Sequence, residues 1–197
     1  MSLMILLLAA GASSRMRGAD KLLEEVGGSP LIATMARRAS ALAPTLVTLP
    51  SLDHPRAEAL QDMDLTVIPV PDAAEGMAAS LRRGTAALPD RATGVMILPA
   101  DMPELTAEDL ATLAQTWQSD PDTIHRATAA DGTPGHPVIF PKDLFGALKQ
   151  LSGDTGARAL LKSNPVRHVA LPARHALTDL DTPEEWAAWR NRQGPRP

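Results

Sequence analysis

The chain has 197 residues, which is long enough to bury one sizeable core and favours one domain over two. Hydrophobic residues make up 44% of the chain, charged residues make up 21%, and the formal net charge is only -4. These values exclude a disordered chain, a collagen-like chain and a polybasic nucleic-acid binder. The sequence contains no cysteine, which excludes disulfides and thiolate metal sites and is typical of a reducing compartment. We therefore expect a cytoplasmic protein that acts on small molecules and binds neither nucleic acid nor membrane.

The apolar run from Leu3 to Ala9 has the length and composition of a strand that is buried on both faces. It resembles the core of a signal peptide, but no basic residue precedes it and the first charge is Arg15. It is also too short to span a bilayer. The run therefore predicts the first strand of a sheet.

Beyond this run, segments of strand length alternate with segments of helical periodicity. In chain order, the sequence predicts a helix at 30–42, a strand at 45–49, a helix at 55–61, a strand at 65–70, a helix at 77–87, a strand at 94–98, a helix after Thr106, strands at 123–127 and 137–140, helices at 143–150 and 155–162, a strand at 166–171 and a last helix from Pro183. Capping boxes formed by Thr106 with Asp109 and by Thr182 with Glu185 mark two of the helix starts. We expect residues 1–190 to form one domain and residues 191–197 to form a frayed tail.

Strands separated by helices indicate an α/β protein of three layers, with a mainly parallel, Rossmann-like sheet between two layers of helices. Ligands of such sheets bind beyond the carboxyl ends of the strands, near the point where the strand order reverses. The candidate functional residues are therefore those in the loops that follow strands.

The loop at residues 9–21 follows the first strand and is rich in small residues. Small residues let backbone N–H groups approach phosphate oxygens, and Arg15 and Lys21 add positive charge. The spacing fits neither the P-loop pattern nor the GxGxxG fingerprint of dinucleotide-binding proteins. The loop therefore predicts an anion site of another kind; the alternative is a flexible turn with solvated cations.

Carboxylates lie in two other predicted loops. Asp101 lies between two prolines after the strand at 94–98, and Asp179 and Asp181 precede the last helix. Mg²⁺ takes few carboxylates and completes its shell with phosphates and water, so Asp101 with Asp179 or Asp181 is a candidate magnesium site. A capping role for Asp101 and a helix-dipole role for Asp181 are the structural alternatives.

Three motifs together resemble the nucleotidyltransferases of molybdenum cofactor biosynthesis, which share the nucleotide-diphospho-sugar transferase fold. LAAGASSRMRGADKLL resembles the family signature LxAGxSxRMGxxKxxL, PADMP resembles GDMP, and DLDTPEEW resembles DIDTPEDL. The match spans nearly the whole chain. Two departures are the extra residue Arg17 and Ala100 in place of the usual glycine.

Further segments resemble the cytidylyltransferase branch of this family. GMAASL resembles GMSxSL, and this resemblance implies that Gly76 and Ser80 read the base with backbone groups of Ala9 and Ala10. The first strand ends at Ala9, Ala10 and Gly11, where we expect the nucleotide phosphates to bind. GHPV and GDTGAR resemble two further motifs, which imply that His136 and Arg158 face the molybdopterin substrate. Each residue has a structural alternative. Gly76 would start a helix and Ser80 would be an ordinary helical serine. His136 would belong to a structural turn, and Arg158 would be a solvated charge on a helix.

The resemblance implies an Mg²⁺-dependent enzyme that transfers CMP from CTP to the phosphate of molybdenum-loaded molybdopterin and releases pyrophosphate. Arg15 and Lys21 would neutralise the pyrophosphate, and Asp101 would hold the metal. One alternative is the same chemistry with GTP or with another phosphate acceptor. Another is a molybdopterin-binding chaperone without turnover that delivers the cofactor to a molybdoenzyme. The sequence leaves open whether a molybdoenzyme or its chaperone is a partner.

Overall fold

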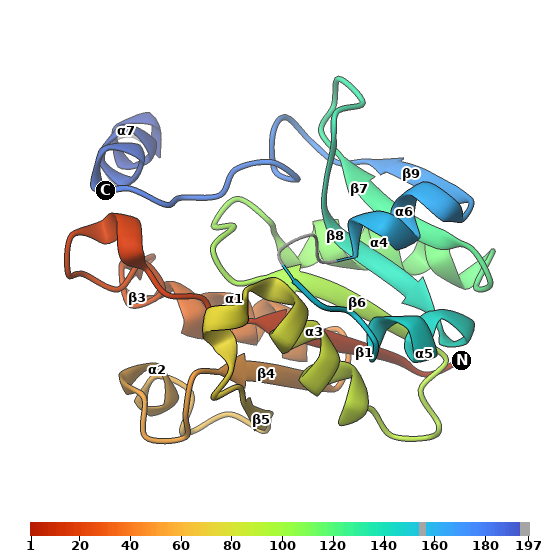
Figure 1. Cartoon of the computed structure of the whole chain (residues 1–197). Coiled ribbons are helices and arrows are strands. Elements are labelled where there is room, and N and C mark those ends of the chain that lie inside the picture. The colour runs from red at the N-terminus through yellow and green to blue at the C-terminus, as the bar shows by residue number, and fades with distance from the viewer. Residues whose placement is uncertain (154–156, 194–197) are drawn as a thin grey trace.

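The computed structural model describes residues 1–153 and 157–193 and contains a seven-stranded sheet in the order β5-β4-β1-β6-β8-β7-β9 (Figure 1). Its strands are β1 (Leu3–Leu8), β4 (Thr45–Leu49), β5 (Thr66–Pro69), β6 (Gly94–Pro99), β7 (Ile124–Thr128), β8 (Pro134–Pro141) and β9 (Val166–Ala170). All neighbouring strands are parallel except β8, which runs antiparallel to both β6 and β7. The predicted α/β class and mainly parallel sheet are confirmed.

Helices cover both faces of this sheet. They are α1 (Leu31–Ser40), α2 (Pro55–Glu58), α3 (Met77–Ala86), α4 (Ala107–Gln118), α5 (Phe145–Leu148), α6 (Arg158–Ser163) and α7 (Pro183–Gln193). In β1, Ile5 and Leu7 pack with residues of α1 and α4, whereas Met4 and Leu6 pack with residues of α3 and α5. Figure 1 shows these pairs of helices on opposite sides of the sheet. The first apolar run is therefore buried on both faces, as its composition predicts.

Both predicted capping boxes are present. The Thr106 hydroxyl accepts a hydrogen bond from the Asp109 amide, and the Asp109 carboxylate accepts one from the Thr106 amide. The same reciprocal pair joins Thr182 and Glu185 at the start of α7. These bonds satisfy amides that the first helical turn leaves without partners, so the two helix starts follow the sequence closely.

Several predicted boundaries were wrong in the shorter elements. The helix expected at 55–61 ends after one turn, and the helix expected at 143–150 divides into a 3₁₀ turn (Lys142–Leu144) and α5. β8 starts at Pro134, three residues before the predicted strand. The ends of such short elements depend on tertiary packing more than on local pattern; Leu60, for example, leaves the helix to reach the core with 3% exposure.

Other parts of the chain were not predicted or lie outside the described residues. A small hairpin joins β2 (Glu25–Val26) and β3 (Ser29–Pro30), and a 3₁₀ helix covers Ala73–Glu75 before α3. The tail expected to fray from residue 191 is helical as far as Gln193. The predicted helix at 155–162 begins in residues outside the described part, and α6 covers the rest of it. Within the described residues, no helix is both long and apolar enough to cross a membrane.

The arrangement brings the loops after β1 and β6 together. These two strands are neighbours, with Leu8 opposite Pro99 at their carboxyl ends. The segment before α7 joins them through a backbone hydrogen bond from Leu180 to the Asp101 carbonyl. The three motifs that are far apart in the sequence therefore meet at one edge of the sheet.

Candidate functional site

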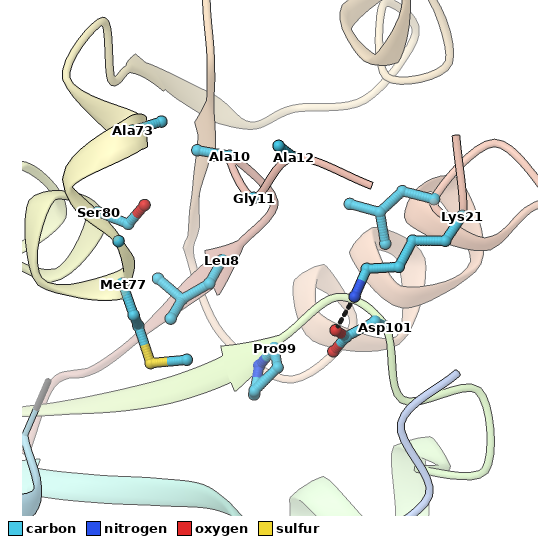
Figure 2. Close-up of a pocket in the computed structure, with 12 residues that line it drawn as sticks. Leu8, Ala10, Gly11, Ala12, Lys21, Ala73, Met77, Ser80, Pro99 and Asp101 are labelled. Carbon is cyan, nitrogen blue, oxygen red and sulfur yellow. Dashed lines mark hydrogen bonds and ion pairs between the residues drawn. The ribbon is translucent and has the colours of Figure 1, made fainter. Parts of the chain in front are cut away.

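A cavity of about 270 Å³ lies beyond the carboxyl ends of β1 and β6 and is closed on one side by the start of α3 (Figure 2). Its lining residues are Leu8, Ala10, Gly11, Ala12, Lys21, Leu22, Ala73, Gly76, Met77, Ser80, Pro99 and Asp101. Six of these residues were predicted as nucleotide or catalytic residues from three separate segments: Ala10, Gly11, Lys21, Gly76, Ser80 and Asp101. Figure 2 shows Ser80 and Met77 on the opposite side of the cavity from Lys21 and Asp101.

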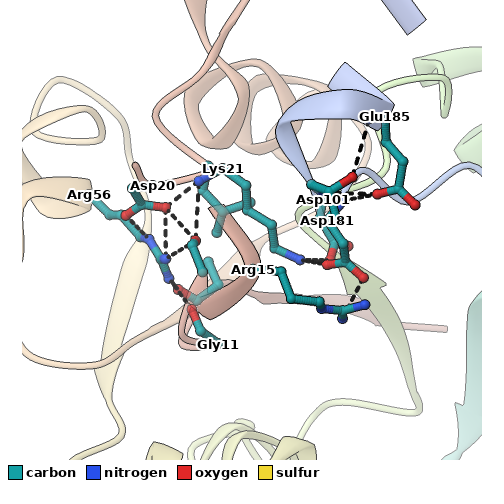
Figure 3. A network of polar contacts seen from close by, with 12 residues as sticks. Gly11, Arg15, Asp20, Lys21, Arg56, Asp101, Asp181 and Glu185 are labelled. Carbon is teal, nitrogen blue, oxygen red and sulfur yellow. Dashed lines mark hydrogen bonds and ion pairs between the residues drawn. The ribbon is translucent and has the colours of Figure 1, made fainter. Parts of the chain in front are cut away.

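Lys21 links two acidic residues at the polar end of this cavity (Figure 3). Its Nζ atom lies 2.5 Å from Asp101 Oδ2 and 2.6 Å from Asp181 Oδ1. The Arg15 guanidinium lies 2.5 Å from the other oxygen of Asp181, although the Arg15 side chain is 68% exposed. The predicted cations and two of the predicted carboxylates thus form one network.

Burial opposes the positive charge of Lys21, but the carboxylates of Asp101 and Asp181 outweigh it and raise the pKa of Lys21. The ammonium group therefore stays charged at neutral pH. Partial desolvation raises the pKa of Asp179, and the negative charges of Asp101 and Asp181 add to this increase. Asp179 lies near the network without pairing with Lys21, whereas Asp181 shares Lys21 with Asp101.

The segment that carries Asp181 is held in place by Glu104, which follows the Asp101 motif. The Thr178 hydroxyl donates to Glu104 Oε2 at 2.6 Å, and the Trp189 indole N–H donates to Glu104 Oε1 at 3.2 Å. Trp189 and Trp186 are buried in the core and anchor α7 to it. The position of Asp181 therefore depends on packing of the last helix.

The carboxylates of Asp101 and Asp181 are hard oxygen donors of the kind that Mg²⁺ takes. In this structure each has an oxygen paired with Lys21. Across residues 1–153 and 157–193, no group of three or more His, Cys, Asp or Glu side chains is arranged to hold a metal ion. Two carboxylates alone would fit a magnesium ion only if its other ligands came from phosphate and water.

Ala9 does not line the cavity, which corrects its predicted role. It is 1% exposed; its amide donates to the Thr48 carbonyl at 3.1 Å, and its carbonyl accepts a hydrogen bond from Arg56. The strand ladder continues through this residue, so its backbone is already engaged within the protein. The accessible part of the loop begins at Ala10.

His136 and Arg158 lie together in a second cavity of about 200 Å³, whose wall also includes Arg126. Burial, helped by the charge of Arg126, lowers the pKa of His136 to about 4, while Asp101 acts in the opposite direction. Met77 lines both this cavity and the first one. The residues expected at the second substrate are therefore beside the predicted nucleotide cavity. Residues 154–156 of the GDTGAR motif, which also contains Arg158, lie outside the described residues.

The sequence reasoning missed two arginines, Arg126 in the second cavity and Arg56 behind the loop after β1. The Nε atom of Arg126 donates to the Gly135 carbonyl at 3.0 Å, beside His136. Neither arginine belongs to a motif. The only signal for Arg126 was a charged residue within a predicted strand.

Comparison with known proteins places this arrangement in a family. A model of the MobA-like NTP transferase domain matches residues 5–170, which cover β1 to β9. The chain belongs to this family. The structure of Rv0371c from Mycobacterium tuberculosis H37Rv is 27% identical, with a TM-score of 0.80 over 96% of this chain and 98% of that one. A structure of Rv0371c in complex with manganese is 25% identical, with a TM-score of 0.78 over 95% of this chain and 97% of that one.

Curated relatives of this MobA-like domain carry different names. The molybdenum cofactor guanylyltransferase of Pseudomonas fluorescens (strain SBW25) is 36% identical over 116 residues, which are 57% of this chain and 54% of that protein. The bifunctional protein GlmU of Mycobacterium sp. (strain KMS) is 30% identical over 171 residues, which cover 81% of this chain. This chain spans 34% of the length of that GlmU protein. The comparisons support a nucleotidyltransferase and do not confirm cytidylyl specificity.

The two departures from the family motif are accommodated by the MobA-like domain. The extra residue Arg17 adopts a left-handed conformation with φ of 54°, and Gly18 follows with φ of 99°. Arg17 points outward and its guanidinium lies 2.6 Å from the Glu184 carboxylate at the surface. Ala100 is fully buried and does not have a positive φ, so the position does not require a glycine. The insertion therefore forms a local bulge beside Arg15.

Proposed function

We propose that this protein transfers CMP from CTP to the phosphate of molybdenum-loaded molybdopterin and releases pyrophosphate. The observation that carries the proposal is the convergence of Lys21, Asp101 and Asp181 at the end of a cavity lined by backbone of the loop after β1. A second, basic cavity adjoins it across Met77. Two neighbouring anion sites suit a reaction that joins a nucleotide to a second phosphate.

The reaction needs no covalent enzyme intermediate. An oxygen of the acceptor phosphate attacks the α-phosphorus of the nucleotide in line, a new P–O–P bond forms, and the bond to the bridging oxygen of the β-phosphate breaks. That oxygen leaves with the electron pair as part of pyrophosphate. The contribution of the protein is to position the two substrates and to stabilise the charge that develops on the leaving group.

Each charged residue has a separate task in this scheme. Lys21 stays protonated and offers its ammonium group to the β- and γ-phosphates, and the exposed Arg15 adds a second cation at the mouth. The carboxylates of Asp101 and Asp181 would hold Mg²⁺, with Asp179 close by. When bound, the ion supplies additional positive charge to the phosphate oxygens. The manganese complex of Rv0371c supports a divalent ion in this family.

Different observations favour cytosine and guanine as the base of the nucleotide. The segment from Gly76 to Leu81 resembles the cytidylyltransferase branch, and the buried Ser80 lies within the cavity. The P. fluorescens relative is named a molybdenum cofactor guanylyltransferase, and this favours transfer of GMP from GTP as the second candidate. The chemistry of the phosphates is the same in both cases.

The test is pyrophosphate release from purified protein with Mg²⁺, molybdenum-loaded molybdopterin and either CTP or GTP, followed by competition between the two. We expect turnover with CTP that excess GTP inhibits weakly. A clear preference for GTP would replace the first candidate by the second. Binding of molybdopterin without pyrophosphate release from either nucleotide would instead support a chaperone.

The second cavity provides an independent check on the acceptor. Replacing Arg126 by Gln is expected to raise the KM for molybdopterin about tenfold or more, because a charge-assisted contact is lost, while the KM for the nucleotide stays unchanged. Arg91→Gln, at an exposed arginine before β6, is the matched control. An unchanged KM for the acceptor in Arg126→Gln would exclude the second cavity as the acceptor site.

A further inference from the structure

Arg56 comes from α2, which follows β4, and its side chain is almost completely buried at 2% exposure. It forms a two-pronged ion pair with Asp20: Nε lies 2.7 Å from Oδ2 and Nη2 lies 2.8 Å from Oδ1 (Figure 3). Asp20 directly precedes Lys21. An arginine buried to this extent is costly unless its donors have partners, so the remaining N–H groups need to be accounted for.

The other donors of Arg56 hold the main chain of the loop after β1. Nη1 lies 2.5 Å from the Ala9 carbonyl oxygen and 2.9 Å from the Gly11 carbonyl oxygen, and Nη2 lies 3.2 Å from Ser13 Oγ. One guanidinium group therefore holds two alternate peptide groups of the loop. Figure 3 shows Arg56 beside Gly11 and Asp20, on the opposite side of the loop from Arg15.

These contacts decide which way two amide groups point. In a trans peptide the carbonyl and the N–H of the next residue point in opposite directions. Because the Ala9 and Gly11 carbonyls point at Arg56, the N–H groups of Ala10 and Ala12 point away from it. Ala10 and Ala12 both line the nucleotide cavity, and neither amide donates a hydrogen bond to any of the described residues. Two backbone donors are thus held available for an anion.

Ser13 and Asp20 connect Arg56 to the backbone of Lys21. Ser13 Oγ donates to Asp20 Oδ1 at 3.0 Å and accepts a hydrogen bond from the Lys21 amide at 3.1 Å. Asp20 Oδ1 also accepts from the Leu22 amide at 3.0 Å. The start of the loop and the residue that carries the ammonium group are therefore tied to one buried ion pair.

We propose that Arg56, through Asp20, is a positioning residue of the nucleotide site: it fixes the loop so that the Ala10 and Ala12 amides and Lys21 are presented together to the triphosphate. This inference rests on the proposed function. Arg56 does not touch the substrate; it acts behind the loop. Without it the loop loses the contacts that orient its peptides, and a misplacement of about 1 Å at a phosphoryl-transfer site costs about a hundredfold in rate.

The test uses Arg56→Lys, which keeps the charge but loses the two-pronged geometry, and the milder Asp20→Asn in case the first variant is poorly folded. Arg37→Lys, the same replacement at an exposed arginine of α1, is the matched control. Dissociation constants for CTP and GTP with Mg²⁺ are measured by titration calorimetry, KM and kcat by pyrophosphate release, and folding by thermal unfolding.

We expect Arg56→Lys to bind the nucleotide about tenfold more weakly, with a matching rise in its KM and no change in the KM of the acceptor. We also expect kcat to fall by up to about a hundredfold, because the loop no longer holds the phosphates in place. Asp20→Asn is expected to change the same constants in the same direction by a smaller factor. In wild type, nucleotide binding should slow hydrogen exchange of the amides of residues 10–13, and this protection should be lost in Arg56→Lys.

Three results would overturn the inference, and they are distinguishable. Lower thermal stability with unchanged nucleotide affinity would make Arg56 a structural residue only. An affinity that falls equally in Arg37→Lys would show that the effect does not depend on the buried position of Arg56. Failure of the wild-type protein to bind either nucleotide would refute the proposed function itself, and the inference with it; this is decided before any variant is made.

Discussion

Replacement of Lys21 by Met is the strongest single test of the active site. The change removes the ammonium group and keeps an unbranched side chain of similar reach. In the structure this group is 2.5 Å from Asp101 and 2.6 Å from Asp181, and the Lys21 side chain is only 13% exposed. No other described cation lies within salt-bridge distance of Asp101, so nothing replaces the lost charge at that end of the cavity.

The expected magnitude follows from these contacts. Removing one preorganised group that stabilises transition-state charge typically costs about 10²–10³-fold in kcat, or about 2.7–4 kcal/mol. Asp101 and Asp181 are also left without their shared counter-ion, and a partly buried group that loses its partner destabilises a protein by about 1–3 kcal/mol. For a chain of this size that cost corresponds to a decrease in Tm of about 2–12 °C.

The assay is pyrophosphate release under single-turnover conditions, with thermal unfolding measured on the same preparation. Lys149→Met, at an exposed lysine after α5, is the matched control and should leave both quantities unchanged. Turnover within tenfold of wild type in a folded Lys21→Met protein would refute the argument that the ammonium group neutralises the leaving pyrophosphate.

Three further predictions concern stability. Gly94→Ala should lower stability by about 1–3 kcal/mol, because a Cβ atom there would lie 2.3 Å from the Trp117 ring, whereas Gly146→Ala meets nothing within 4 Å and should be tolerated; equal Tm values for the two variants would contradict this. Burial lowers the pKa of His125, so the unfolded chain binds the proton more readily and stability should fall as the pH drops below about 6.5; His125→Leu should flatten this dependence in urea unfolding, and an unchanged slope would count against it. Thr106→Ala should cost about 1 kcal/mol by removing the cap of α4, again measured by urea unfolding, and no loss would show that the capping box contributes little.

Most of the fold could be predicted from the sequence, because the central strands β1 and β6 are apolar and capping boxes mark the starts of α4 and α7. Every strand of the seven-stranded sheet overlaps a predicted strand. The reversed direction of β8 was not located in advance, although the turn that causes it was visible. Asp131 and Gly132 fall between β7 and β8, Gly132 has a positive φ, and so short a connection permits only antiparallel pairing.

The sequence could not show which of Asp179 and Asp181 pairs with Lys21. Alternation places both residues on one side of an extended segment, but it does not place that segment against the Asp101 loop. Contacts of Glu104 with Thr178 and Trp189 do so in the folded protein, and they bring Asp181 to Lys21. Contacts between residues so far apart in the sequence leave no local sequence pattern from which they could be predicted.

Arg56 shows why motifs identify one half of such a site and not the other. Residues that face the ligand, such as Lys21 and Asp101, need particular side chains at particular spacings, and that need is what a motif records. Arg56 instead bonds to the carbonyls of Ala9 and Gly11, which any sequence supplies, and it lies 36 residues further along the chain than its partner Asp20. Its role therefore depends on the direction of these peptide groups and on the distant ion pair with Asp20, and only the folded chain makes both visible.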